Sequence, residues 1–202
     1  MEFEKQMSPY PIFSLQEIRK AFLDFSYRQL ERWEKKRYVM KIRRQYYMLT
    51  KQDRERNFLW FTSNKIYAPS YISLETALKF YGFIPEEIFQ ITSISTKKTV
   101  EFKTAIGNFK YHKIKPQLFF GYHLMDFRNK NILIADPEKA ILDYLYFHPN
   151  IKTENDIHEI RINSQEFHEQ IDRVKFMKYL EGFGSKTLNR RAKIFLKYME
   201  ND

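Results

Sequence analysis

Two short segments near the N-terminus, residues 14–22 and 26–36, carry apolar side chains at helical spacing. The first opens with Ser14 and Glu17, which have the spacing of a capping box. In that motif the serine caps the first turn and the glutamate bonds back to the serine backbone. The second segment opens the same way, with Ser26 and a glutamine three positions later. Only three residues separate the segments, so the pattern predicts two helices joined by a tight turn.

A β-hairpin is predicted directly after the second helix. Its strands are Tyr38–Ile42 and Tyr46–Leu49, which are rich in β-prone side chains, and the polar residues Arg43–Gln45 separate them. The next stretch, Thr50–Asn57, is polar and highly charged, and it marks the first predicted domain boundary. A helix that opens at Asp53 would continue from there into apolar sequence.

The region after this boundary predicts helices and strands in alternation. One helix is expected over Ser73–Tyr81, where a glycine stops it. Another is expected over Asp136–Phe147, with Asp136 at the N-cap and Pro137 at the first helical position. Five strands are predicted between these helices, at Ile88–Ser95, Val100–Thr104, Phe109–Lys115, Tyr122–Phe127 and Asn131–Ile134.

From Asn150 onward the chain is predicted to be helical, with a break at Gly182–Gly184. The whole pattern therefore predicts an α+β protein. A winged helix-turn-helix domain is expected over residues 1–56. A mixed α/β domain follows over 57–202, with its sheet ending near residue 149 and a helical tail after it.

The second predicted helix has one basic face. At about 100° per residue, four cations fall in a single stripe with an amide at its edge, and the opposite side is apolar and aromatic. The basic face consists of Arg28, Gln29, Arg32, Lys35 and Lys36, and the opposite face of Tyr27, Leu30 and Trp33. Cations neutralise phosphates, and arginine or glutamine can read base edges in the major groove. This face is therefore predicted to bind DNA.

Further contacts are predicted around this helix. Ser26 and Tyr27, at its N-terminus, can donate hydrogen bonds to a phosphate. The hairpin places Lys41, Arg43 and Arg44 at or beside its tip, where a wing would follow the DNA backbone or the minor groove. The alternative is an ordinary solvated face, on which Glu31 and Glu34 form surface salt bridges with these cations.

Composition favours a polyanionic partner. The formal net charge is +10, and an apolar content of 43% is enough for a packed core. The first residues are acidic and no apolar stretch follows them, so no signal peptide is expected. No apolar run is long enough to predict a membrane span. The chain has no cysteine, which fits the cytoplasm, and five histidines without metal-ligand spacing. No cofactor is predicted, since the sequence has no phosphate-binding glycine loop.

One acidic cluster allows an enzymatic alternative. Asp136, Glu138 and Lys139 resemble the carboxylates and lysine of magnesium-dependent nucleases. The favoured interpretation is structural, because an aspartate N-cap, a proline at the first helical position and a glutamate in the first turn all stabilise a helix start. The protein is therefore expected not to be an enzyme.

The second region resembles AbiEi-type antitoxins of type IV toxin–antitoxin, or abortive-infection, systems. The resemblance rests on the serial order of motifs in Ser70–Ile84, Thr104–Tyr111 and Ile134–Asp143, followed by the tail around Arg161–Asp172 and the Arg190–Arg191 helix. It covers nearly the whole chain, because the predicted winged helix stands where this family carries its own. Family members usually have glycines at the positions of Arg37 and Gln45 and a longer first helix, which is short or missing here.

The resemblance implies a bacterial regulator of phage defence. It would bind inverted repeats in its own promoter DNA and antagonise an AbiEii-like nucleotidyltransferase toxin, with or without direct contact. As an alternative, the protein is an interaction module without DNA binding, which neutralises the toxin or protects its RNA target. Its surface would then be the basic last helix, with Lys186, Arg190, Arg191, Lys193 and Lys197.

Overall fold

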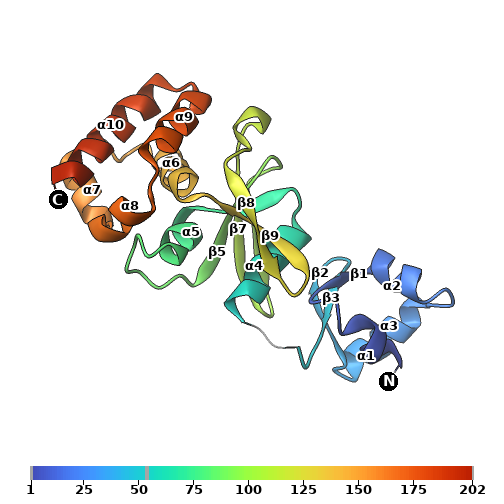
Figure 1. Ribbon diagram of the computed structural model, residues 1–202. Coiled ribbons are helices and arrows are strands. Elements are labelled where there is room, and N and C mark those ends of the chain that lie inside the picture. Colours follow the sequence, from blue (N-terminus) through green and yellow to red (C-terminus); the bar gives the residue numbers. More distant parts are fainter. Residues whose placement is uncertain (1, 53–54, 202) are drawn as a thin grey trace.

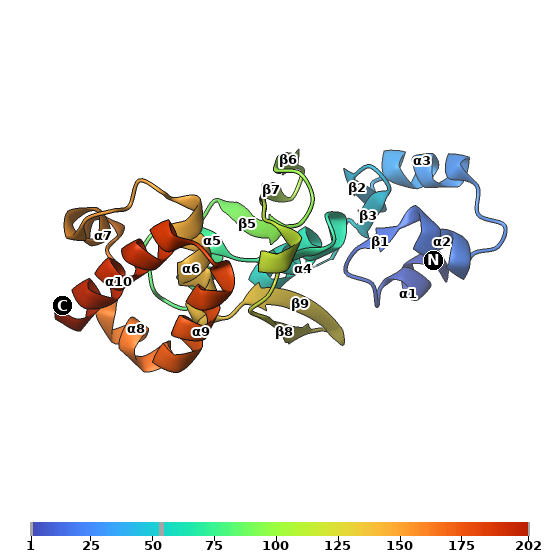
Figure 2. The same ribbon diagram turned by 90° about the horizontal axis from the view of Figure 1, so that it is seen from above.

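The structure is a computed structural model that describes residues 2–52 and 55–201. Within these residues it is a mixed α+β fold with ten α-helices, one short 3-10 helix and nine strands. The elements form three parts in a row, with the N-terminal part and the C-terminal helices at opposite ends of a central sheet (Figures 1 and 2). The α+β class predicted from the sequence is thus confirmed. No helix in the described ranges has the length and apolarity needed to cross a bilayer.

The N-terminal part combines three helices with a small antiparallel sheet, in which the strand order is β1-β3-β2. Its elements are α1 (Glu2–Met7), β1 (Phe13–Ser14), α2 (Leu15–Ala21), α3 (Tyr27–Lys35), β2 (Val39–Arg43) and β3 (Tyr46–Leu49). Both predicted helix starts are confirmed, since Ser14 and Glu17 form the complete capping box and Ser26 caps α3. The short helix α1 packs its buried Phe3 and Met7 against the other elements of this part.

The central part is a six-stranded mixed sheet in the order β6-β7-β5-β4-β9-β8. Only the β4–β9 and β5–β7 pairs are parallel. The strands are β4 (Ser70–Ile72), β5 (Gln90–Ser95), β6 (Val100–Thr104), β7 (Gly107–Lys113), β8 (Tyr122–Phe127) and β9 (Lys130–Ala135). The helices are α4 (Arg56–Ile66), α5 (Leu74–Phe80), η1 (Pro116–Leu118) and α6 (Pro137–Phe147). The expected helix opening at Asp53 lies outside the described residues, and α4 begins at Arg56.

Helices α4 and α5 cover opposite faces of this sheet. Ser93 on β5 hydrogen-bonds Ser63 on α4 through their hydroxyls (2.8 Å), while its neighbour Thr92 hydrogen-bonds Thr76 on α5 (3.0 Å). Successive strand residues point to opposite faces, so these two contacts place the helices on the two sides. Burial on both faces explains why β5 has five consecutive buried residues and no apolar alternation.

The C-terminal part contains four helices: α7 (Glu154–Ile160), α8 (Ser164–Gln170), α9 (Arg173–Phe183) and α10 (Lys186–Asn201). The predicted break is confirmed, since α9 ends before Gly184, which has φ +59°. The main core runs from this part through the sheet and reaches Ile12, Ile42 and Met48 in the N-terminal part. A second, smaller cluster lies within the N-terminal part itself.

Candidate nucleic-acid interface

Helix α3 is held by its apolar face. Leu30 is buried in the small N-terminal cluster, and the ring of Trp33 lies 3.9 Å from that of Phe3, between centroids. At its C-terminus, Arg37 has a left-handed backbone, and its amide and that of Tyr38 donate to carbonyls of the last turn. This is the Schellman pattern, which ends the helix without a glycine. The opposite face of α3 consequently points away from the cluster.

The four cations predicted on that outward face are all exposed. Arg28, Arg32, Lys35 and Lys36 make no ion pair within residues 2–52 and 55–201, although Glu31 lies on the same helix. The predicted alternative of surface salt bridges with the glutamates of α3 is therefore absent from the described part of the chain. A row of cations without acidic partners creates a positive potential suited to phosphates.

The other residues predicted on α3 have mixed surroundings. The Ser26 hydroxyl oxygen accepts a hydrogen bond from the backbone amide of Gln29 (3.3 Å), and the hydroxyl proton remains available to a second acceptor. Tyr27 is 47% exposed, and its phenol contacts that of Tyr47. Burial, together with the nearby phenol and glutamates, raises the pKa of Tyr47. The Gln29 side chain is half-buried and lines a pocket with Trp33, so it lies on the inner side of the helix.

The hairpin brings only two of its three predicted cations to the surface. Lys41 on β2 and Arg44 in the turn are exposed. Arg43 is the last residue of β2 and stands beside the tip, as predicted, but its side chain turns to the central part. Its guanidinium donates to the Ile66 carbonyl oxygen (2.7 Å) and lies 3.7 Å from the Phe102 ring centroid. Because that side chain contacts the central part of the molecule, Arg43 is corrected from a wing residue to an anchor between the two parts.

Four of the five cations predicted on the last helix form a line along α10. Lys186, Arg190, Lys193 and Lys197 are exposed and lie within one narrow stripe at about 100° per residue. Arg191 is 7% exposed and turns inward, where Nη1 donates to the carbonyls of Leu145 (2.5 Å) and His148 (3.0 Å) at the end of α6. Burial lowers the pKa of Arg191. Its role is therefore structural, a correction to the predicted surface.

The acidic cluster at the start of α6 divides into two separate groups. Asp136 is the N-cap residue of α6, as predicted. Its carboxylate, however, makes no capping hydrogen bond to the first turn of the helix, contrary to the interpretation from sequence. It accepts instead from Tyr179 (2.7 Å) and contacts His123 (2.8 Å) and Lys175 (3.2 Å). Burial alone would raise the pKa of Asp136, but these three contacts outweigh it and lower the pKa. Lys175 also reaches Glu138 (3.1 Å).

The second group surrounds Lys139. This lysine is fully buried and pairs with Asp143 one turn later, and it donates to the Tyr71 hydroxyl (2.8 Å). Tyr71 and Ser73 both donate to the other oxygen of Asp143 (2.9 and 2.8 Å). Burial lowers the pKa of Lys139, and Asp143 partly offsets that effect. Only the Lys–Asp spacing on α6 was visible in the sequence, since the hydroxyls come from a distant strand and turn.

This division does not favour the nuclease alternative. The mechanism needs Asp136, Glu138 and Lys139 to converge on one accessible metal ion. In the structure the Lys139 ammonium is buried on Asp143, while the other two carboxylates share Lys175. Among the described residues, no group of three or more histidines, aspartates or glutamates is arranged to hold a metal ion.

Comparisons with known proteins add no functional assignment. The sequence matches no protein-family model, and no curated protein matches it. The resemblance to AbiEi-type antitoxins accordingly rests on the order of its motifs alone.

Proposed function

We propose that the protein is a DNA-binding regulator that grips duplex DNA with α3 and the β2–β3 hairpin. The observation that carries the proposal is the arrangement of the N-terminal part. Its order α1-β1-α2-α3-β2-β3 and its strand order β1-β3-β2 are those expected of a winged helix-turn-helix. The exposed cations lie on the two elements that such a domain presents to DNA, namely α3 and the hairpin.

Six exposed cations form the proposed DNA-binding surface: Arg28, Arg32, Lys35, Lys36, Lys41 and Arg44. If all six neutralise phosphates, the logarithm of the binding constant should fall against that of the salt concentration with a slope of about −5. Arginines at the start of α3 can also reach base edges, which would add sequence preference to this electrostatic attraction.

Gel shifts on the DNA upstream of the protein's own gene test the assignment. Replacement of Arg28, Arg32, Lys35 and Arg44 by alanine should abolish the shift and flatten the salt slope. A matched control replaces Lys186, Arg190, Lys193 and Lys197 by alanine, which removes the same charge at the other end of the molecule. Equal loss in both variants would show that net charge alone is responsible, and full retention in the first variant would reject the surface.

We further propose that this regulator is the antitoxin of a type IV toxin–antitoxin system. The support is the serial order of motifs through the central and C-terminal parts, which resembles AbiEi-type antitoxins. The functional partner would be an AbiEii-like nucleotidyltransferase toxin, and the DNA target would be inverted repeats in the shared promoter. Co-expression of the protein with an AbiEii-like nucleotidyltransferase toxin should restore growth of the poisoned cells, and failure to do so would reject the antitoxin role.

A second candidate function follows from α10. From Gly182 to Met199 the chain has five cations and no acidic residue, whereas α7 and α8 carry glutamates and aspartate on their exposed faces. Surface residues that serve solubility alone usually have both signs interspersed. The stripe would therefore contact the toxin or its RNA target. Rescue lost in the α10 quadruple variant, but retained in the α3 variant, would favour this interaction module over the repressor.

A further inference from the structure

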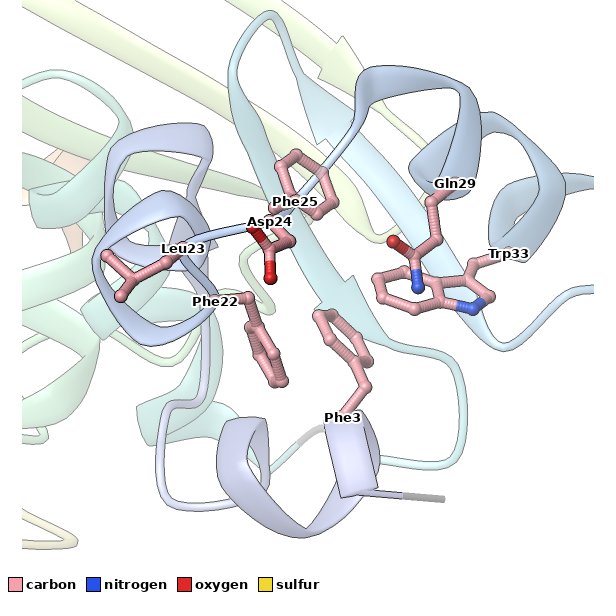
Figure 3. Close-up of a pocket in the computed structure, with 7 residues that line it drawn as sticks. All are labelled: Phe3, Phe22, Leu23, Asp24, Phe25, Gln29 and Trp33. Carbon is pink, nitrogen blue, oxygen red and sulfur yellow. The ribbon is translucent and has the colours of Figure 1, made fainter.

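The N-terminal part contains a pocket of about 400 Å³ between α1, the α2–α3 turn and α3 (Figure 3). Its size lies within the range typical of small-molecule sites. Four of its seven lining residues are aromatic, and the other three come from the α2–α3 turn and from α3. The lining residues are Phe3, Phe22, Leu23, Asp24, Phe25, Gln29 and Trp33.

The rings pack directly against one another and form an aromatic wall on one side of the pocket. Phe3 is the central one, with its centroid 3.9 Å from that of Trp33 and 5.4 Å from that of Phe22. The ring centroid of Phe25 lies 6.2 Å from that of Trp33. Phe22, Phe25 and Trp33 are all half-buried, so each keeps part of its ring surface open to a ligand.

The two polar groups of the pocket have no hydrogen-bond partner among the described residues. The Asp24 carboxylate points into the space between Phe22 and Phe25, and the Gln29 amide lies beside Trp33 (Figure 3). Asp24 is the one charged residue in the lining, in a chain whose net charge is +10. An anionic ligand would find no cation in this lining, whereas a cation would find a carboxylate and aromatic faces.

We propose that this pocket binds a small organic cation with an aromatic or branched apolar body. The apolar body would pack on the open ring surfaces of Phe22, Phe25 and Trp33, the cationic head would bind Asp24, and cation–π attraction would add to the affinity. Leu23 is 95% exposed and points away from the rings, so the chain's own side chain does not fill the space.

Binding here would act on α3, a consequence that rests on the proposed DNA-binding function. Gln29 and Trp33 line the pocket from the inner face of α3, and Arg28 and Arg32 stand on the outer face of the same helix. A ligand bound between α1 and α3 would change the angle at which α3 approaches DNA. The pocket would then serve as an effector site of the regulator.

Nuclear magnetic resonance of the full chain tests the site, since the protein has two tryptophans. Trp33 lines the pocket, and Trp60 is buried on α4 and serves as an internal control. Phenethylammonium, phenethyl alcohol and phenylpropionate share a ring and differ in the charge of the head. The ammonium should shift the indole N–H signal of Trp33 alone and bind about tenfold more tightly than the alcohol, with the carboxylate weakest.

Asp24→Asn should remove the preference for the ammonium while leaving the alcohol unchanged, and Asp126→Asn, the same charge change on β8, should alter neither. Equal binding of all three probes, or no shift of Trp33, would overturn the proposal. A Trp33 signal that depends on protein concentration, and that loses this dependence in Leu23→Ala, would mean that a second copy of the chain occupies the pocket, which would also overturn it.

The effector role has a separate readout. Gel shifts with and without saturating phenethylammonium should differ in DNA affinity for the native chain and not for Asp24→Asn. If the chain binds no DNA at all, the Trp33 titration still decides whether the pocket binds a cation. Unchanged DNA affinity with a bound probe would reject the effector role alone.

Discussion

Two residues of the N-terminal part adopt backbone angles that favour glycine. Arg37 has φ +57° after α3, and Gln45 has φ +71° in the turn of the hairpin. A side chain in this left-handed region costs about 1–2 kcal/mol, which glycine avoids at an entropic cost of about 0.5–1 kcal/mol. Gln45→Gly should therefore raise the free energy of unfolding by up to about 1 kcal/mol, measured by denaturant titration.

The control for this change is the neighbouring turn residue. Arg44 does not have a positive φ, so Arg44→Gly should lower stability or leave it unchanged. Gln45→Ala, which keeps a Cβ, should give no gain. A loss of stability in Gln45→Gly would show that the Gln45 side chain contributes more than its backbone costs.

At this scale the local signals in the sequence were informative. The capping box of Ser14 and Glu17 and the cap of Ser26 depend on neighbours within three positions, and both could be read from spacing. Arg43 and Arg191 looked equivalent to the exposed arginines beside them. Their partners, Ile66 and Leu145, are 23 and 46 positions away, so no local pattern could separate these two inward-facing arginines from the exposed ones.

Helix α6 depends on the buried pair of Lys139 and Asp143. Lys139→Met removes the cation and leaves the carboxylate buried, which should cost about 3–5 kcal/mol in denaturant unfolding. The double variant Lys139→Met/Asp143→Asn removes both charges and keeps an acceptor for Tyr71 and Ser73, so it should recover most of that loss. Additive losses would show that the two charges do not stabilise each other.

The start of α6 should be sensitive to acid. The pKa of Asp136 is lowered in the folded protein, so its stabilising contribution is present above the ordinary aspartate pKa and lost as the pH falls through the folded value. Asp136→Asn should cost about 1–3 kcal/mol at pH 7. The difference from the native chain should shrink steadily below about pH 4 in denaturant titrations. A difference that stays constant with pH would rule out this ionic contribution.

The sequence predicted most of these elements, but neither strand β4 nor the contacts of the Asp136 carboxylate. Strand β4 has three residues, all buried, which is too short to show a period. It nevertheless lies in the middle of the sheet, between β5 and β9. The helix start at Asp136 and Pro137 was predicted correctly, whereas the partners of the Asp136 carboxylate come from β8 and α9 and could not be inferred from spacing.

At the scale of the whole molecule, charged side chains join the N-terminal and central parts. Lys65 of α4 pairs with Glu17 of α2 (2.5 Å), Lys130 lies over the Tyr10 ring, and Arg43 reaches Ile66 and Phe102. Ile42 and Met48 add apolar contacts to the main core. These contacts hold the hairpin and the rest of the N-terminal part against the central part, and no order of elements along the sequence could reveal them.

Arg43 and Arg44, neighbours in the hairpin, allow the structural contact with the central part to be tested separately from the proposed DNA contact. Arg43→Met should lower the free energy of unfolding by about 1–3 kcal/mol, because the Ile66 carbonyl loses a charged donor and Phe102 loses its cation. Its DNA affinity should fall little, since the side chain does not face outward. Arg44→Met should leave stability unchanged and weaken DNA binding, with a salt slope smaller by about one. Denaturant unfolding and gel shifts on both variants test this, and exchange of the two effects would reject the DNA-binding surface proposed for the hairpin.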